Sequence, residues 1–108
     1  MFRVKITVKE TARREDYIKE YCKDGEMPAC PFFKEGDVFY VNYLDEMPEG
    51  FCGWMWHDIH KDIMGLLTGG EYFWMDDPKK ALVCCTDPFR TVYLLLEREV
   101  VENPNRGY

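Results

Sequence analysis

Five cysteines and two histidines are the side chains of this 108-residue chain best suited to nucleophilic or metal chemistry. They are densest in FCGWMWHDIH, residues 51–60, which holds one cysteine, both histidines and two tryptophans. A thiolate is a nucleophile and a metal ligand, and a neutral histidine is a ligand as well. This stretch is therefore the best candidate in the sequence for a reactive thiol or a metal site.

Cys52 lies at or just before the first turn of a helix predicted over residues 52–68. The helix is indicated by apolar residues that recur at three- and four-residue steps, namely Cys52, Met55, Trp56, Ile59, Ile63 and Leu66. Free amide N–H groups and the positive end of the helix dipole favour a thiolate at such a place. We therefore predict Cys52 as the catalytic cysteine, although a cysteine is also a small hydrophobic residue that packs well in a core.

Three further cysteines lie outside this helix and bear on the same site. Cys30 precedes Pro31 in a loop, which favours an extended backbone. Cys84 and Cys85 are neighbours in a predicted strand, so their side chains face opposite sides and only one can point toward a given site. The sequence contains no C-x-x-C pair, so any metal site must be assembled from distant segments.

We predict that Cys30, Cys52 and Cys85 converge in the folded chain, with His57 as the fourth member of the site. Three thiols and one histidine suit tetrahedral zinc or iron. The same residues without a metal suit nucleophilic or thiol–disulfide chemistry, and the sequence does not choose between the two. Cys22 belongs to the apolar face of a shorter helix, and we interpret it as a packing residue.

Aromatic residues make up 16% of the chain and suggest a second kind of site. Trp54, Trp56 and Trp74 lie on both sides of Gly69 and Gly70, where rings can form the wall of a pocket that stacks a flat ligand. Such a pocket would make the protein a noncatalytic binding module for a small molecule or a protein. The alternative is that the rings form the core of a small domain. Trp54 lies off the apolar stripe of the helix and is the best candidate for an exposed ring.

Periodicity and turn residues predict a single α+β domain over residues 1–102 with a mainly antiparallel sheet. A TDPF turn joins the last two strands into a hairpin, which leaves no room for the crossover helix of a parallel sheet. Residues 71–75 are expected to form a strand or a packed extended segment, and residues 103–108 a frayed tail. The other expected elements are strands 2–8, 36–44, 81–85 and 90–100, the main helix 52–68, and a shorter N-terminal helix from a Thr11 cap to about Cys22.

The formal net charge of −6 argues against nucleic-acid binding, because contacts to phosphate need a basic surface. It also argues against an anionic membrane surface, and no apolar run approaches the roughly 20 residues that span a bilayer. Residues 1–10 alternate polar and apolar side chains, unlike a signal peptide, so we expect a cytoplasmic protein with mostly reduced cysteines. The aromatic content is compatible with a homo-oligomer, and the small size with an accessory subunit of a larger enzyme.

The ordered motifs ACPFFKEGDVF, PEGFCGWMWHDIHKDIMGLLTGGEYFWMDDP and VCCTDPFRTVYLLLER resemble a family of short bacterial and archaeal proteins. The family pattern has Cys-Pro before Gly-Asp-x-Phe, then Pro-x-Gly-x-Cys, a helix with Trp and His, Gly-Gly before an aromatic residue, and Cys-x-Asp. The match covers most of residues 28–98 and the first strand. The resemblance implies Cys30, Cys52 and Cys85 as the pattern cysteines and marks the segment around Cys22 as an insertion. It implies no activity, because the family has none assigned.

Overall fold

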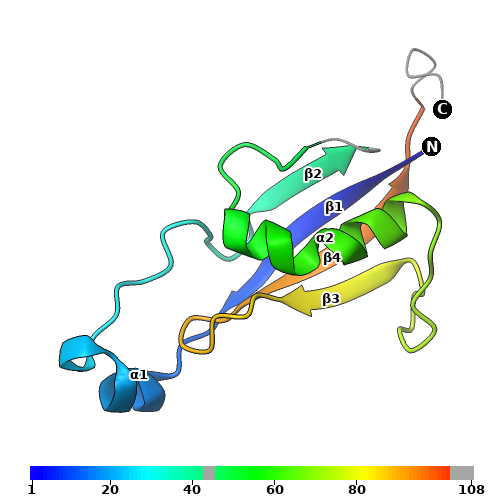
Figure 1. Ribbon diagram of the computed structural model, residues 1–108. Helices are drawn as coiled ribbons and strands as arrows, with labels where there is room; N and C mark the ends of the chain where they lie inside the picture. The colour runs from blue at the N-terminus through cyan, green and yellow to red at the C-terminus, as the bar shows by residue number, and fades with distance from the viewer. Residues whose placement is uncertain (43–45, 103–108) are drawn as a thin grey trace.

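The computed structural model describes residues 1–42 and 46–102, which form one four-stranded sheet and two α-helices (Figure 1). The predicted α+β class, with an antiparallel sheet and one main helix, is confirmed. In chain order the elements are β1 (Phe2–Thr11), α1 (Glu15–Tyr21), the short 3-10 helix η1 (Lys23–Gly25), β2 (Val38–Asn42), α2 (Gly53–Leu67), β3 (Lys80–Cys84) and β4 (Val92–Val100). No helix in the described ranges is long and apolar enough to cross a membrane.

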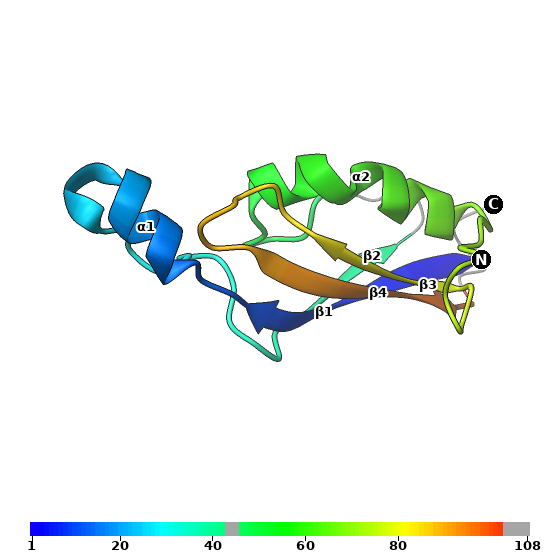
Figure 2. The same ribbon diagram turned by 90° about the horizontal axis from the view of Figure 1, so that it is seen from below.

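The strands lie in the order β2-β1-β4-β3, every neighbouring pair is antiparallel, and β3 and β4 form the predicted hairpin. Along β1 the buried residues Val4, Ile6 and Val8 alternate with polar ones, and this two-residue period places all three side chains on one face. Figure 2 shows α2 lying across one face of the sheet, while no helix of the described chain covers the other face. The core is therefore a single layer between α2 and one side of the sheet.

The helix α2 carries the apolar stripe that the sequence predicts. Met55, Ile59, Ile63 and Leu66 are all fully buried in the core. Each such side chain contributes roughly 2 kcal/mol of hydrophobic stabilisation. The helix spans one residue less at each end than predicted, because Cys52 is its N-cap residue, with an extended backbone, and does not belong to the first turn.

An arm, residues 12–29, leaves the sheet after β1 and carries α1. Figure 1 shows α1 beyond one end of the sheet, and Figure 2 shows it outside the two layers made by α2 and the strands. The molecule is consequently elongated, with principal extents of 54 × 30 × 21 Å. The predicted Thr11 cap is wrong, because Thr11 is the last residue of β1 and pairs with Val92, while α1 begins after Arg14.

The apolar face predicted for the first helix is only partly buried. Ile18 is 1% exposed, but Tyr17 and Tyr21 are exposed to solvent. The hollow beside Ile18 is lined by the arm's own residues, among them Met27 and Pro28. Ile18 is therefore buried apart from the main core cluster, while the N–H of Arg14 ties the arm to the carbonyl of Phe89 at 2.9 Å.

Residues 71–75 are neither the strand nor the packed extended segment that the sequence predicts, because the chain turns at Phe73 and Trp74, which are 90% and 67% exposed. They form consecutive turns, closed by a hydrogen bond of 2.9 Å that the N–H of Tyr72 donates to the carbonyl of Pro78. The tail predicted at residues 103–108, and residues 43–44 of the second predicted strand, lie outside the described residues.

Candidate functional site

A pocket of about 370 Å³ lies between the N-terminus of α2, the loop before β2 and the loop that joins β3 to β4. Cys30, Cys52 and Cys85 all line it, one from each of these three segments. Their side chains are half-buried and pack against the core, and all five cysteines of the chain are free thiols. We call this cavity the thiol pocket. Its wall also includes Phe32, Phe33, Trp54, Met55, Phe89 and Arg90.

Cys52 is positioned by the residue before it. The ring of Phe51 is buried and lies 5.1 Å, centroid to centroid, from the rings of both Phe33 and Phe39. This anchor brings the chain into α2 at a fixed point, where the Cys52 carbonyl accepts the first helical hydrogen bond, from the N–H of Trp56 at 2.9 Å. The Cys52 side chain makes no capping hydrogen bond, so its sulfur is not occupied by the helix.

Cys85 directly follows β3 and is held by the hairpin that β3 forms with β4. Its sulfur accepts a hydrogen bond from the N–H of Val92 at 3.3 Å and lies 4.0 Å from the carbonyl oxygen of Arg90. Its own N–H donates to the Val92 carbonyl at 3.1 Å. Cys84 is exposed and is not part of the pocket wall. Of the two adjacent cysteines, Cys85 is the one that faces the pocket.

The loop after Cys85 is organised around the Asp87 carboxylate. It accepts hydrogen bonds from the N–H groups of Phe89 and Arg90 at 2.9 and 3.1 Å, and it forms an ion pair of 3.1 Å with the Arg90 guanidinium. Partial burial raises the pKa of Asp87, but these three contacts outweigh burial and leave the pKa below its usual value. Arg90 also donates to the carbonyl of Pro28 at 3.1 Å, which ties this loop to the segment that carries Cys30.

A chain of three side chains ties the same loop to α2. The indole N–H of Trp54 donates to the Thr86 hydroxyl at 2.7 Å, and that hydroxyl donates to Asp58 at 3.1 Å. Asp58 also accepts the backbone N–H of Thr86 at 2.9 Å. All three segments of the thiol pocket are thus joined by hydrogen bonds that begin in the β3–β4 loop.

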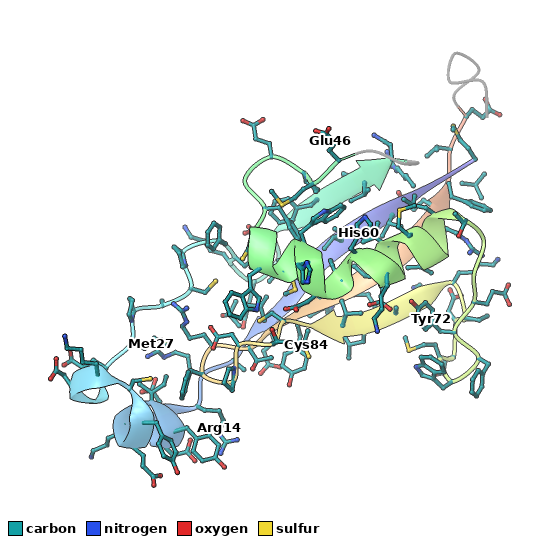
Figure 3. The ribbon with its side chains drawn as sticks, viewed as in Figure 1. Arg14, Met27, Glu46, His60, Tyr72 and Cys84 are labelled. Carbon is teal, nitrogen blue, oxygen red and sulfur yellow. The ribbon has the colours of Figure 1, made fainter. Side chains whose placement is uncertain are left out.

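The predicted fourth member, His57, is exposed and does not line the thiol pocket. Among residues 1–42 and 46–102, no three His, Cys, Asp or Glu side chains are arranged to hold a metal ion. Only the three cysteines of the predicted set therefore line one pocket, namely Cys30, Cys52 and Cys85, and His57 does not. His60 packs edge-on against Trp56 with ring centroids 5.4 Å apart, and Figure 3 shows it on the side of α2 opposite Cys84.

The three predicted pocket tryptophans do not share one wall. Trp54 lines the thiol pocket and is 65% exposed, as predicted. Trp56 is half-buried and packs on the edge of the core beside Phe51, with ring centroids 6.1 Å apart. Trp74 lies beside Tyr72 in a separate groove along β3.

Tyr72 closes one end of that groove. Its hydroxyl donates to Asp62 of α2 at 2.6 Å, and Figure 3 shows it in the loop after α2, at the far end of the molecule from Arg14. Burial of the ring, with the hydrogen bond to Asp62, raises the pKa of Tyr72 above its usual value. The groove is thus structurally distinct from the thiol pocket.

Comparison with known proteins does not assign the chain to a family. No family model, curated protein or solved structure matches the chain. The family resemblance of the motifs therefore remains a prediction.

Sequence reasoning missed the polar residues that shape the pocket. Thr86, Asp87 and Arg90 were expected only as parts of a turn and a strand, and Asp58 had no assigned role. One signal was present, since an aspartate before a proline often accepts backbone N–H groups two and three residues on. Asp87 does so, and this local pattern predicts an ordered loop wall, although not what it faces.

Proposed function

We propose that the thiol pocket is a redox-active site that exchanges thiol and disulfide with a small molecule. One observation carries the proposal. Cys30, Cys52 and Cys85 come from three separate segments and line one cavity, while Cys22 and Cys84 do not line it. A pocket with more than one thiol can supply both an attacking and a resolving cysteine, which a single cysteine cannot.

Cys52 is the attacking thiol in this proposal. A helix N-terminus is the environment in which reactive cysteines are commonly found, and the Cys52 side chain makes no hydrogen bond to the helix. Cys85 is the resolving thiol, because the N–H of Val92 holds its sulfur at the pocket wall. Cys30, in the loop before Pro31, is the third thiol of the pocket.

The oxidising direction has two steps. The Cys52 thiolate attacks one sulfur of a small disulfide R–S–S–R, so a bond forms to Cys52, the S–S bond of the small molecule breaks, and one R–S⁻ leaves. The Cys85 thiolate then attacks the Cys52 sulfur, which forms the protein disulfide and releases the second R–S⁻. The two cysteines lose two electrons and two protons, which appear in two R–SH molecules.

The size and lining of the pocket indicate the class of ligand. A volume of about 370 Å³ is that of a site for a small molecule and not for a folded partner. The rings of Phe32, Trp54 and Phe89 provide apolar contact surface, and Arg90 is already paired with Asp87. We therefore expect a thiol or disulfide whose body is mainly apolar.

Noncovalent binding in the same pocket is the second candidate, favoured by the exposed Trp54 ring at its wall. Tryptophan fluorescence during a screen of small apolar compounds separates the two candidates. Binding that survives Cys52→Ser but is lost in Trp54→Ala supports a binding module without thiol chemistry.

The redox proposal is tested by oxidising the protein with a disulfide, trapping the thiols with acid and mapping disulfides by mass spectrometry. Diethyl disulfide, which is small and apolar, is the matched probe for this pocket, and glutathione disulfide is the large charged comparison. With the apolar probe we expect one disulfide within the set Cys30, Cys52 and Cys85. Cys84→Ser should oxidise like the wild type, and Cys52→Ser should lose the disulfide or form it much more slowly. Full oxidation without a disulfide inside the set, or unchanged oxidation of Cys52→Ser, would contradict the proposal.

A further inference from the structure

The strand β3 is an edge of the sheet, and its pairing with β4 determines which of its backbone groups are free. The carbonyl of Lys79 accepts a hydrogen bond from the N–H of Arg98, and the N–H of Cys85 donates one to the carbonyl of Val92, at 3.1 Å in each case. Because antiparallel pairing alternates, odd-numbered residues of β3 point their N–H and C=O toward β4 and even-numbered residues point theirs outward. Leu82 and Cys84 therefore present their N–H and C=O groups at the outer edge.

Both ends of this edge are closed by the chain itself. The N–H of Lys80 donates to the Asp77 carbonyl at 3.1 Å, and the N–H of Thr86 donates to the Asp58 carboxylate at 2.9 Å. Within the described residues no hydrogen bond outside the sheet engages the backbone of Leu82 or Cys84. The centre of the open edge is thus a short window formed by the N–H and C=O groups of Leu82 and Cys84.

Large apolar side chains are exposed along the same edge. Leu82 is 58% exposed, and Trp74, which lines the same groove as Leu82, is 67% exposed. Trp54 is exposed at the opposite end of the strand, where it bonds to Thr86. Edge strands are normally protected by charge, proline or a covering element, and apolar residues exposed beside free backbone groups indicate a pairing surface.

We propose that a second copy of this chain pairs with β3 in antiparallel orientation, with Val83 on the twofold axis. In this register Leu82 of each copy lies opposite Cys84 of the other. Every outward N–H of these residues then meets an outward C=O, which makes four hydrogen bonds between the copies and one eight-stranded sheet. Lys80 and Thr86 lie opposite each other, and their N–H groups already have acceptors within each copy. The proposal does not depend on the thiol chemistry.

Charge and shape favour a second copy as the occupant. Antiparallel pairing brings the exposed Lys79 of one copy toward the end of the other strand where Asp58 lies, whereas Lys80 is already paired with Glu97 at 3.2 Å. The same rotation brings the exposed Trp74 of one copy toward the exposed Trp54 of the other. The twofold axis repeats each of these contacts, so opposite charges and exposed rings lie close together on both sides of the axis. A self-complementary interface requires this repetition.

Sedimentation equilibrium in reducing buffer tests the dimer, whose mass should be twice the 12.9 kDa of the chain. Leu82→Glu places a charge in the middle of the interface and should raise the dimer dissociation constant about tenfold or more. Val38→Glu is the matched control, because Val38 is 43% exposed on the other edge strand in the same cross-strand row. A monomer at all concentrations, or dissociation by Val38→Glu but not by Leu82→Glu, overturns the proposal.

Cross-linking tests the register. Residues opposite each other in a hydrogen-bonded pair have Cα atoms about 5.5 Å apart, within the range that a disulfide spans. Leu82→Cys should therefore form a covalent dimer through Cys84 of the other copy on mild oxidation, and adding Cys84→Ser should abolish it. Because residue 82 is exposed, the variant should fold like the wild type, which circular dichroism checks. Absence of the cross-link, or its persistence without Cys84, overturns the register.

Discussion

The indole N–H of Trp54 donates a hydrogen bond to the hydroxyl of Thr86 at 2.7 Å. Trp54 lies two residues after Cys52, and Thr86 directly follows Cys85, so this bond joins the two segments that carry the proposed attacking and resolving thiols. The Thr86 hydroxyl in turn donates a hydrogen bond to the carboxylate of Asp58, which belongs to α2. Helix–sheet packing alone does not fix the position of a loop. Beside the pocket, these side-chain hydrogen bonds therefore set the distance between α2 and the β3–β4 loop.

We expect Thr86→Val to loosen this link with little change in side-chain shape. It removes one hydroxyl that both accepts from Trp54 and donates to Asp58, and the free energy of unfolding should fall by about 1–2 kcal/mol in a urea titration. Disulfide formation in the thiol pocket should slow in parallel. Thr86→Ser keeps the hydroxyl and is the control, and equal behaviour of the two variants would show that the link is unimportant.

Asp87→Asn should destabilise the loop wall at neutral pH, by about 1–2 kcal/mol, since it weakens hydrogen bonds to a charged acceptor. The folded-state pKa of Asp87 is lowered, so its contribution is fully present above the unfolded-state value of about 3.9 and is lost as pH falls through the lower folded value. Urea midpoints measured from pH 7 to acid should thus show the wild type and variant converging only below about pH 4.

For comparison, Asp76→Asn changes an exposed carboxylate in the loop before β3. It should leave the free energy of unfolding unchanged across the same pH series. Convergence of Asp87→Asn with the wild type already near pH 6 would contradict the proposed role of the ionised carboxylate.

The parts of the fold that depend on local periodicity could be predicted from the sequence. Val4, Ile6 and Val8 alternate in β1 as expected, and Ile59 and Ile63 lie on the buried stripe of α2. Both patterns repeat over several turns or strand residues, so neighbouring positions reinforce one another. The same periodicity also predicted Trp54 as an exposed ring, because it lies off that stripe.

The parts that depend on distant contacts could not be predicted. Whether Cys84 or Cys85 faces the pocket depends on the register of β3 against β4, in which Ala81 pairs with Leu96 on the buried face. The edge position of β3 follows from the sheet order, which no local pattern encodes. Phe51 is buried whereas the nearby Trp54 is exposed. The aromatic content of the chain does not predict which of its rings are buried.

The first helix shows a different limit. Its apolar residues predict a buried stripe, but α1 lies on the arm and its one buried residue, Ile18, lies outside the main core cluster. We therefore expect Ile18→Ala to lower the stability of the arm and to affect global unfolding little, by less than about 1 kcal/mol. Ile63→Ala, in the main core, should cost about 3 kcal/mol.

Hydrogen exchange followed by mass spectrometry separates the two effects. Ile18→Ala should speed exchange in residues 15–25 and leave β1 and β4 protected as in the wild type. A loss of protection throughout the sheet would show that the arm and the domain unfold as one unit, and would contradict the separate burial of Ile18.

Removal of metal should not change the protein, because no three His, Cys, Asp or Glu side chains of the described residues are arranged to hold a metal ion. Protein purified without oxygen and without a metal affinity column should contain far less than one equivalent of zinc or iron. Chelator treatment should leave both the thermal midpoint and the reactivity of the pocket thiols unchanged. One bound equivalent that is lost in Cys52→Ser and kept in Cys84→Ser would instead support the metal site predicted from Cys30, Cys52 and Cys85, and would replace thiol exchange as the function of the pocket.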